Sequence, residues 1–493
     1  MPAQPATLRH LPAVFWGLLA ATAAVRMIGI ARPLLGPFAT KNVVYAMIAR
    51  NWARGDAPIW LPTLDLLRGG GGGLHLVEYP VSACLTAGLW RLFGGSLDVW
   101  GRATAVAFST ASVALMFVYV RRRHGPQAAT AAAIVLAFAP VSIIYGQSFM
   151  LEASVVFFTL AVLYALDRWL EPGRGGWLVV ATFCLALLLL TKIYMLVILL
   201  PAAWAVWCSQ RKRRGLALAA VAVALLPAAV WYGYVLSEAS AGGSLSPRVY
   251  YSVVQSMEAH RSPHLLLGSA DFYCQVLDDL SGVALTPIGL ALLLAGLLYR
   301  RWWQYAPWLA AMVLLVAALP RKFHEANYYY LVVLPPLAVM VGLGWDVLRE
   351  RVRPGRLTVV VVVAVALLFA ARYSVKPAFV TPPEDRAVVA AARAVRQLTA
   401  EDEPVVTIHG TAPDLLYYCD RPGWALDATT PKLADALESC RRQGARYVVV
   451  VGDVSIRAEL VTKGDGFRVY RLAGTRRRAR RTYRKWGQTD VSH

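Results

Sequence analysis

Residues 176–208 read GWLVVATFCLALLLLTKIYMLVILLPAAWAVWC, an apolar stretch of 33 residues interrupted by one charge, Lys192. A helix needs about 20 residues to cross a hydrocarbon core of about 30 Å. The stretch is therefore either one long helix or two short helices broken near Thr191 and Lys192. In both cases it must be helical, because lipid offers the backbone no hydrogen-bond partners.

Apolar runs of this kind recur over most of the chain. The composition agrees, since 58% of the 493 residues are hydrophobic and only 16% are charged, against about a quarter charged in soluble domains. With the two halves 176–191 and 193–208, we predict a polytopic α-helical membrane protein with about eleven transmembrane helices. The other predicted spans are 11–31, taken as a retained first span, 98–120, 126–144, 150–170, 215–236, 283–299, 304–320, 328–347 and 356–373.

Basic clusters between the runs predict the topology. Cytoplasmic loops carry an excess of Lys and Arg, and a cytoplasmic N-terminus with eleven spans puts every dense cluster inside except Arg321-Lys322. A single span at 176–208 would invert all later loops, which favours two helices there. The formal net charge of +21 is thus explained by topology, and nucleic acid is not an expected partner. The inside clusters are Arg121–Arg123, Arg174, Arg211–Arg214, Arg300-Arg301, and Arg349, Arg351, Arg353 and Arg356.

This topology places residues 32–97, residues 237–282 and everything after about 374 on the outer face of a cell inner (plasma) membrane. Residues 42–54 carry apolar side chains among polar ones, a pattern typical of an interfacial helix. The run Gly69–Gly73 is expected to be flexible. Glu78-Tyr79-Pro80 then opens a second short interfacial helix that reaches about Phe93.

Residues 376–475 predict a small extracytoplasmic α/β domain, because helices and strands alternate in them. The transmembrane domain is expected to cover residues 1–375, and residues 476–493 form a basic tail suited to anionic lipid. No glycine-rich nucleotide fingerprint occurs in the α/β domain. The expected helices are 384–398, 413–419 and 432–443, and the expected strands are 405–408, 446–451 and 467–472.

Two acidic residues lie at the same predicted outer depth. Glu78 stands at the start of the short helix, and Glu152 ends the turn Gln147–Glu152 before the fourth span. Each is interpreted either as a helix cap, which the helix dipole favours, or as a functional carboxylate. The functional roles are a general base and a ligand to a divalent cation.

Cationic and aromatic residues also gather at the outer face. Lys192 either extends its ammonium toward the interface or binds a phosphate as a point charge. Arg321-Lys322-Phe323-His324 breaks the positive-inside pattern, and Tyr328–Tyr330 follow. These residues are interpreted either as an aromatic belt or as a cationic clamp for an anionic lipid head with aromatic rings for a sugar or isoprenoid.

The arrangement over residues 10–375 resembles the GT-C glycosyltransferases of the protein-mannosyltransferase and lipid A aminoarabinose-transferase type. Tyr45-Ala46 followed by Glu78-Tyr79-Pro80 is similar to that family's first outer loop, and Gln147–Glu152 to its second acidic site. Leu190-Thr191-Lys192 is similar to its Leu-Thr-Lys turn, and His324–Pro336 to its late helix. The resemblance implies sugar transfer from a polyprenyl-phosphate carrier on the outer face, with a divalent metal (Mg, Mn or Zn) for which Glu78 and Glu152 are the candidate ligands.

The chain departs from the family at one point, because Lys41 and Asn42 occupy the positions of an acidic pair. Glu78 is therefore the predicted base. The function predicted is transfer of a hexosyl or pentosyl group to a lipid, glycan or protein acceptor of the cell envelope. The alternative is a non-catalytic membrane protein or a transporter in envelope polysaccharide assembly. The predicted site comprises Glu78 and Glu152 as catalytic residues, Lys192, Arg321, Lys322 and His324 at the donor phosphate, and Lys41, Tyr45, Tyr79, Tyr328 and Tyr329 as substrate contacts.

Overall fold

The computed structural model describes residues 11–36, 38–68, 71–209, 213–239, 248–252, 255, 263–351, 375–410 and 412–472. The predicted span 356–373 and the basic tail 476–493 lie outside these residues. The chain divides into two compact units. Unit 1 comprises Met1–Ile30, Arg102–Gly233 and Ser256–Phe379, and unit 2 comprises Ala31–Gly101, Tyr234–Gln255 and Val380–His493.

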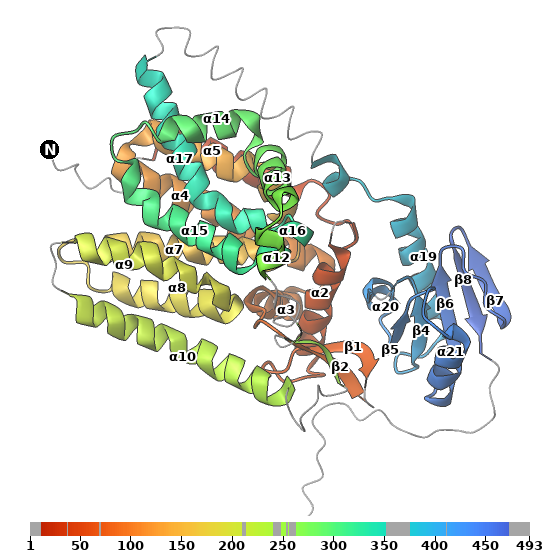
Figure 1. The fold of residues 1–493 in the computed structure, drawn as a ribbon. Helices are drawn as coiled ribbons and strands as arrows, with labels where there is room; N and C mark the ends of the chain where they lie inside the picture. The colour runs from red at the N-terminus through yellow and green to blue at the C-terminus, as the bar shows by residue number, and fades with distance from the viewer. Residues whose placement is uncertain are drawn as a thin grey trace, which may run out of the picture. The chain divides into compact units, whose positions relative to one another are not determined.

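Unit 1 is built from helices (Figure 1). Each apolar run predicted inside the described residues contains helix. By length and composition, α4, α10 and α17 are able to cross a membrane, and the bent pair made by α13–η3 and α14 raises the number to four among the described residues. The count of about eleven spans stays a prediction. The helices are α1 (Ala13–Met27), α4 (Leu97–His124), α5 (Pro126–Phe138), α6 (Pro140–Tyr145), α7 (Glu152–Trp169), α8 (Trp177–Thr191), η2 (Ile193–Ile198), α9 (Leu199–Cys208), α10 (Arg214–Ala239), α12 (Pro263–Leu267), α13 (Ala270–Asp279), η3 (Leu280–Ala284), α14 (Thr286–Gly296), η4 (Trp302–Tyr305), α15 (Ala306–Ala318), α16 (Pro320–Glu325), α17 (Tyr329–Arg351) and η5 (Lys376–Phe379).

The break at Lys192 separates two helices. α8 ends at Thr191, Lys192 is extended with φ −148° and ψ 99°, and the chain resumes as η2 and α9. Leu178 at the start of α8 packs in the same apolar cluster as Val206 near the end of α9. The chain therefore reverses at Lys192, as the neighbouring ribbons of α8 and α9 show in Figure 1. Of the two interpretations of residues 176–208, the structure has the two short helices.

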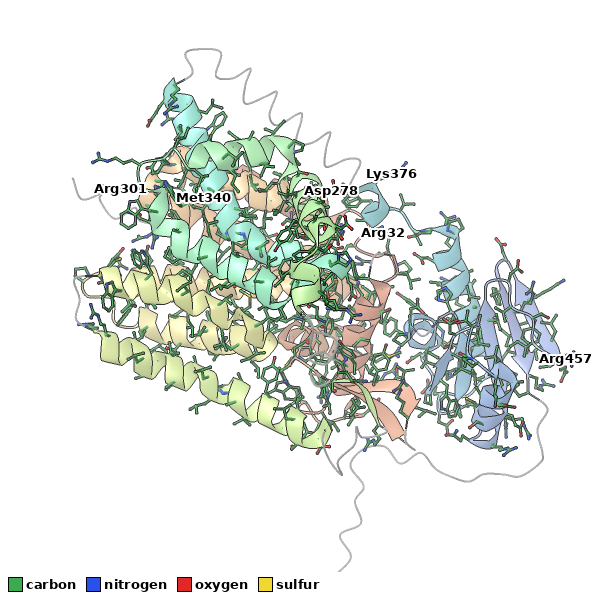
Figure 2. All side chains as sticks on the ribbon, in the orientation of Figure 1. Arg32, Asp278, Arg301, Met340, Lys376 and Arg457 are labelled. Carbon is green, nitrogen blue, oxygen red and sulfur yellow. The ribbon has the colours of Figure 1, made fainter. Side chains whose placement is uncertain are left out.

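Small residues bring α14 and α17 into close contact. A Cβ on Gly296 would lie 2.2 Å from the carbonyl oxygen of Met340, and one on Gly344 would lie 1.8 Å from that of Leu292. Met340 is labelled among the helices in Figure 2. Close backbone approach at small residues is a common way for membrane helices to pack, because lipid provides no hydrophobic drive between them.

Unit 2 contains one eight-stranded sheet in the order β3-β2-β1-β5-β4-β6-β8-β7. Its C-terminal part is the predicted sheet domain. The hairpin β1–β2, from the first outer segment, extends that sheet through a parallel bridge between Leu66 and Gly423. The elements are α2 (Ala39–Arg54), β1 (Thr63–Arg68), β2 (Gly71–Leu76), α3 (Val81–Phe93), β3 (Val249–Ser252), α19 (Pro383–Leu398), β4 (Val405–Ile408), α20 (Asp414–Cys419), β5 (Gly423–Leu426), α21 (Leu433–Arg442), β6 (Tyr447–Val451), β7 (Glu459–Gly464) and β8 (Phe467–Arg471).

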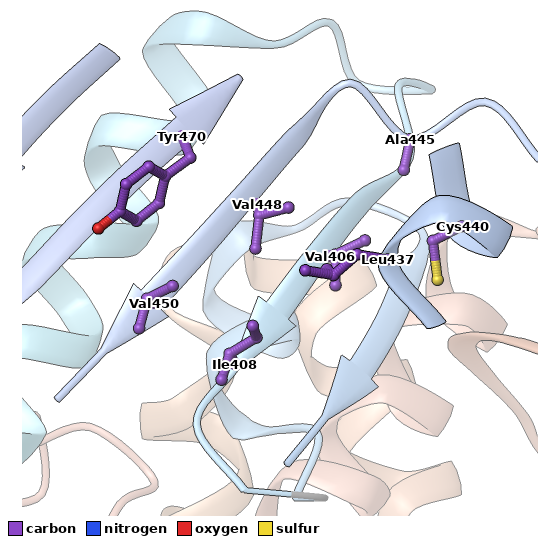
Figure 3. Packing of buried hydrophobic residues seen from close by; sticks show 8 residues of the cluster. All are labelled: Val406, Ile408, Leu437, Cys440, Ala445, Val448, Val450 and Tyr470. Atoms are coloured by element: carbon purple, nitrogen blue, oxygen red, sulfur yellow. The ribbon is translucent and has the colours of Figure 1, made fainter. Parts of the chain in front are cut away.

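The C-terminal sheet has an apolar core against α21. Val406 and Ile408 of β4 point to one face because side chains alternate along a strand, and Val448 and Val450 of β6 do the same. Figure 3 shows these side chains with Leu437 and Cys440 of α21, Ala445 and Tyr470. The six elements expected in this region are present. Two strands of this region, β5 and β7, are not predicted from the sequence. β5 is short, β7 is largely exposed, and neither carries an alternating apolar pattern.

Two local expectations are wrong. The residues from Asn42 to Trp52 are all buried in α2, so this helix is covered on every side and not on one apolar face. Gly71–Gly73 belong to β2 and pair with β1, so this part of the glycine run is strand. A Cβ on Gly73 would lie 3.2 Å from the carbonyl oxygen of Leu66, and glycine permits that close approach.

The C-terminal domain carries a histidine–aspartate pair between the end of β4 and the start of α20. His409 Nδ1 lies 3.2 Å from Asp414 Oδ1. This hydrogen bond, with the charges of Asp414 and Asp385, raises the pKa of His409 against the opposing effect of burial. Because the pKa is raised on folding, the stabilisation is complete below the unfolded value of about 6.5 and disappears as pH rises through the folded value.

We therefore expect His409→Gln to lower the melting temperature of the full chain more at pH 5.5 than at pH 8.5. Thermal unfolding of both proteins in the same detergent across this range measures the difference. A difference between the two melting temperatures that grows with pH would contradict a raised pKa of His409 in the folded protein.

Candidate functional site

Glu78 lies in the turn that follows β2 and is 6% exposed. The helix-cap interpretation is wrong, because α3 begins at Val81 and its cap position is Pro80. The hydroxyl of Tyr45 on α2 donates a hydrogen bond of 2.5 Å to Glu78 Oε1. The structure thus brings together two predicted site residues that are 33 positions apart.

Aromatic rings adjoin the Tyr45–Glu78 pair. The His75 ring stands edge-on to Tyr45 at 6.1 Å and stacks with Tyr251 at 6.3 Å between centroids. His75 and Tyr251 are register partners on β2 and β3, so their side chains share one face of the sheet. Neither residue is predicted as part of the site from the sequence, although a histidine three residues before Glu78 is a visible signal.

The other two predicted substrate contacts in unit 2 are Tyr79 and Lys41. Tyr79 stacks on Trp52 with centroids 5.7 Å apart, and its hydroxyl donates to the carbonyl oxygen of Ile59. Tyr79 therefore contributes to packing of the first outer segment. Lys41 is half-buried in the first turn of α2. Substrate contact by either residue stays a prediction.

Glu152 and Lys192 form a buried ion pair in unit 1. Glu152 begins α7 and is 1% exposed, and the Lys192 side chain is 4% exposed, with Nζ 3.9 Å from Glu152 Oε1. Neither carboxylate oxygen of Glu152 has a hydrogen-bond partner among the described residues. Buried charges are costly unless compensated. A buried carboxylate whose oxygens lack hydrogen-bond partners calls for an explanation, and a polar ligand that supplies those hydrogen bonds is one.

Tyrosine rings extend from this pair. Lys192 Nζ lies 5.8 Å from the ring centroid of Tyr194. The Tyr194 ring is 6.0 Å from Tyr329, which lies 4.6 Å from Tyr328. All of them are buried or half-buried. The structure therefore joins the predicted Lys192, Tyr328 and Tyr329 through Tyr194, a residue that was not predicted from the sequence.

A further polar group adjoins Tyr328. The Tyr145 ring lies 5.9 Å from the Tyr328 ring, and its hydroxyl donates to Asn327 Oδ1 at 2.5 Å. The side-chain amide of Gln147 is buried and lacks a hydrogen-bond partner among the described residues. Asn327 and Gln147 both occur in the stretches quoted for the family resemblance, which is the signal that would have found them.

The cationic segment of α16 is more exposed. Arg321 is exposed and its guanidinium pairs with Glu325 at 2.6 Å. Lys322 is half-buried, and His324 is exposed, with its carbonyl oxygen accepting a hydrogen bond from Gln275. Their role at a donor phosphate stays a prediction.

The described residues do not form a group of three or more His, Cys, Asp or Glu side chains that could hold a metal ion. Glu78 and Glu152 belong to different units, and a cation shared by them stays a prediction. Beside Glu152 the structure has the Lys192 ammonium, which already provides the positive charge there.

Comparison with solved structures identifies the fold. ArnT from Cupriavidus metallidurans in the apo state matches with a TM-score of 0.50 and 14% identity, covering 93% of this chain and 97% of that one. The Archaeoglobus fulgidus oligosaccharyltransferase AglB, in complex with an inhibitory peptide and a dolichol-phosphate, has a TM-score of 0.55 and 13% identity over 89% and 69% of the two chains. The arabinofuranosyltransferase AftD from Mycobacteria has a TM-score of 0.50 and 16% identity, with 94% of this chain and 40% of AftD covered.

These comparisons confirm the predicted resemblance: the fold is that of the GT-C glycosyltransferases. Residues 78–234 also match the sequence model of the dolichyl-phosphate-mannose-protein mannosyltransferase family. That segment begins at Glu78 and includes Glu152 and Lys192. No curated protein sequence matches the chain.

Proposed function

We propose that the protein is an integral membrane glycosyltransferase. It moves a hexosyl or pentosyl group from a polyprenyl-phosphate donor to a lipid, glycan or protein acceptor on the outer face of the plasma membrane. The observation that carries the proposal is the pair of buried polar centres, Tyr45–Glu78 and Glu152–Lys192. Glu78, Glu152 and Lys192 lie within the matched segment 78–234. The presence of a dolichol-phosphate in the AglB complex supports the class of donor.

Glu78 is the proposed general base. Its carboxylate takes the proton of the acceptor hydroxyl while the acceptor oxygen forms a bond to the anomeric carbon of the sugar. The hydrogen bond from Tyr45 holds Oε1 in one orientation. A positioned base of this kind contributes about 10²–10⁴-fold to the rate.

Lys192 is the proposed stabiliser of the leaving group. As the bond between the anomeric carbon and the phosphate oxygen breaks, its electron pair passes to that oxygen, and the nearby ammonium offsets the developing charge. The effect is large because the Lys192 side chain is only 4% exposed and electrostatic interactions strengthen where water is excluded. Arg321, Lys322 and His324 assist at the donor head, and Tyr328 and Tyr329 contact the donor.

Glu152 is the proposed positioning carboxylate for the acceptor. Its oxygens lack hydrogen-bond partners among the described residues, so acceptor hydroxyl groups would supply the hydrogen bonds that a buried carboxylate requires. Its charge also keeps Lys192 in place between turnovers.

The alternative function is that of a non-catalytic membrane protein or a transporter. A transporter is expected to carry internal repeats and broken helices near the middle of the membrane, and no repeat is visible in the sequence. The polar groups described above lie instead at helix ends, at the start of α7 and after α8. This placement favours an enzyme.

The test is sugar transfer from a pool of synthetic polyprenyl-phosphate sugars by the purified protein, with and without a chelator. We expect donor consumption and transfer that depend on Glu78. Loss of transfer on chelation alone would assign a cation to the reaction. A folded protein that neither hydrolyses nor transfers any donor of the pool, and binds no polyprenyl phosphate, would favour the non-catalytic alternative.

A further inference from the structure

The C-terminal domain is joined to α2, the helix that carries Tyr45, by a buried ionic network within unit 2. Arg50 of α2 is 6% exposed. Its guanidinium contacts Asp65 on β1 and Asp420 at the end of α20, the latter at 2.9 Å. It also donates to the carbonyl oxygen of Tyr417 at 2.9 Å and lies 4.6 Å from the centroid of that ring.

Asp420 receives a second arginine from the same helix. Arg54 places both terminal nitrogens 2.8 Å from the two carboxylate oxygens of Asp420. Burial alone would raise the pKa of Asp420, but the Arg54 hydrogen bonds and the charges of Arg50 and Arg54 outweigh it and lower the pKa. One carboxylate of the C-terminal domain therefore binds two successive turns of α2.

A second contact joins the same segment of α20 to the first outer segment. The hydroxyls of Tyr417 and Tyr418 donate to the two oxygens of Asp98, at 2.6 and 2.8 Å. The backbone N–H of Leu34 in turn donates to the Tyr418 hydroxyl. The loop before α2 and the start of α4 are thus held by consecutive tyrosines, and the sheet itself is continuous through β1 and β5.

This network acts on the helix that carries Tyr45. Arg50 follows Tyr45 by five residues on a rigid helix, which is about 7.5 Å along the axis. A rotation or shift of α2 that breaks the Arg50 contacts would also move the Tyr45 hydroxyl away from Glu78. Misplacement of a catalytic group by about 1 Å can cost about 10²-fold in rate.

We infer that Arg50 is a positioning residue for the reaction at Glu78, and that the C-terminal domain acts through Arg50 and Asp420 to hold Tyr45 against Glu78. The inference rests on the proposed function. It assigns the domain a part in turnover that needs no substrate contact of its own, because the domain completes the support of the helix that orients the base.

The test compares kcat and the KM for the donor in Arg50→Met, Asp420→Asn and Arg50→Lys. We expect Arg50→Met to lower kcat by about 10²-fold with a KM near the wild-type value. Asp420→Asn keeps an oxygen acceptor and leaves the contact between Arg50 and Asp65 intact. This variant should therefore fold, and its kcat should fall less than that of Arg50→Met. Arg50→Lys should recover part of the loss, because lysine keeps the charge without the planar fork. Arg442→Ala on α21, which removes an exposed ion pair with Glu438, is the matched control and should leave kcat unchanged.

A double-mutant cycle separates positioning from simple stabilisation. If Arg50 acts through Tyr45, the loss caused by Asp420→Asn or Arg50→Met should largely disappear in a Tyr45→Phe background. The inference would be overturned if the losses in kcat multiply fully when Tyr45→Phe is combined with Asp420→Asn or Arg50→Met. A wild-type kcat in both Asp420→Asn and Arg50→Met would also overturn it. Full turnover in Glu78→Gln would instead refute the proposed function, so the two failures are distinguishable.

Discussion

Glu78→Gln is expected to lower kcat by about 10²–10⁴-fold, the range that a positioned general base contributes. The amide oxygen of glutamine still accepts the hydrogen bond that Tyr45 donates at 2.5 Å, so the fold and the orientation of the side chain should persist. Only the ability to take a proton is lost. Initial rates of sugar transfer from a synthetic polyprenyl-phosphate donor measure the effect.

The matched control is Tyr45→Phe, which removes the hydroxyl but keeps the carboxylate. We expect its kcat to fall less than that of Glu78→Gln, because a base that is less well oriented still takes a proton. Equal melting temperatures for wild type and Glu78→Gln would show that folding is intact. Under that condition, undiminished turnover in Glu78→Gln would exclude Glu78 as the base.

Lys192→Met is expected to reduce both stability and activity. It leaves Glu152, which is 1% exposed, as a buried carboxylate without its counter-charge, and breaking a buried pair in this way costs about 3–5 kcal/mol. Loss of the leaving-group contact should lower kcat by about 10²–10³-fold, as removal of one preorganised electrostatic contact does elsewhere. Thermal unfolding in detergent and single-turnover transfer rates measure the two effects separately.

The double variant Lys192→Met with Glu152→Gln separates the two effects. It removes both charges, so stability should return close to the wild-type value. Activity should stay low, because no ammonium remains near the breaking bond. Recovery of activity together with stability would mean that Lys192 serves only to balance Glu152.

Local patterns in the sequence predict most of the secondary structure. Apolar runs indicate helices because lipid leaves the backbone no alternative, and the charge at Lys192 marks the place where α8 ends. The C-terminal strands Val405–Ile408 and Tyr447–Val451 stand out because their runs of valine are short and continuous. α2 is different. Its residues Asn42, Arg50 and Asn51 predict an exposed face because they are polar, but all three are buried in the structure.

The sequence also indicates the residues around which the site is built. Glu78, Glu152 and Lys192 stand out because ionisable groups near membrane depth are costly and rarely kept without a role. Tyr45 enters through the family resemblance, whereas Tyr328 and Tyr329 already stand out because they follow the basic segment at Arg321–His324. Residues such as Tyr194 and His75 are not separable from ordinary aromatic or polar positions by sequence pattern alone.

By itself, the sequence determined that this is a helical membrane protein with a small sheet domain after it, and which charged residues are candidates for its chemistry. Only the tertiary structure decided which distant residues pair: Tyr45 with Glu78, Lys192 with Glu152, and Arg54 with Asp420, 366 positions further along the chain. The physical reason is that helix and strand patterns repeat within a few residues. Hydrogen bonds and ion pairs between distant segments depend on how the chain folds back on itself, which no local period records.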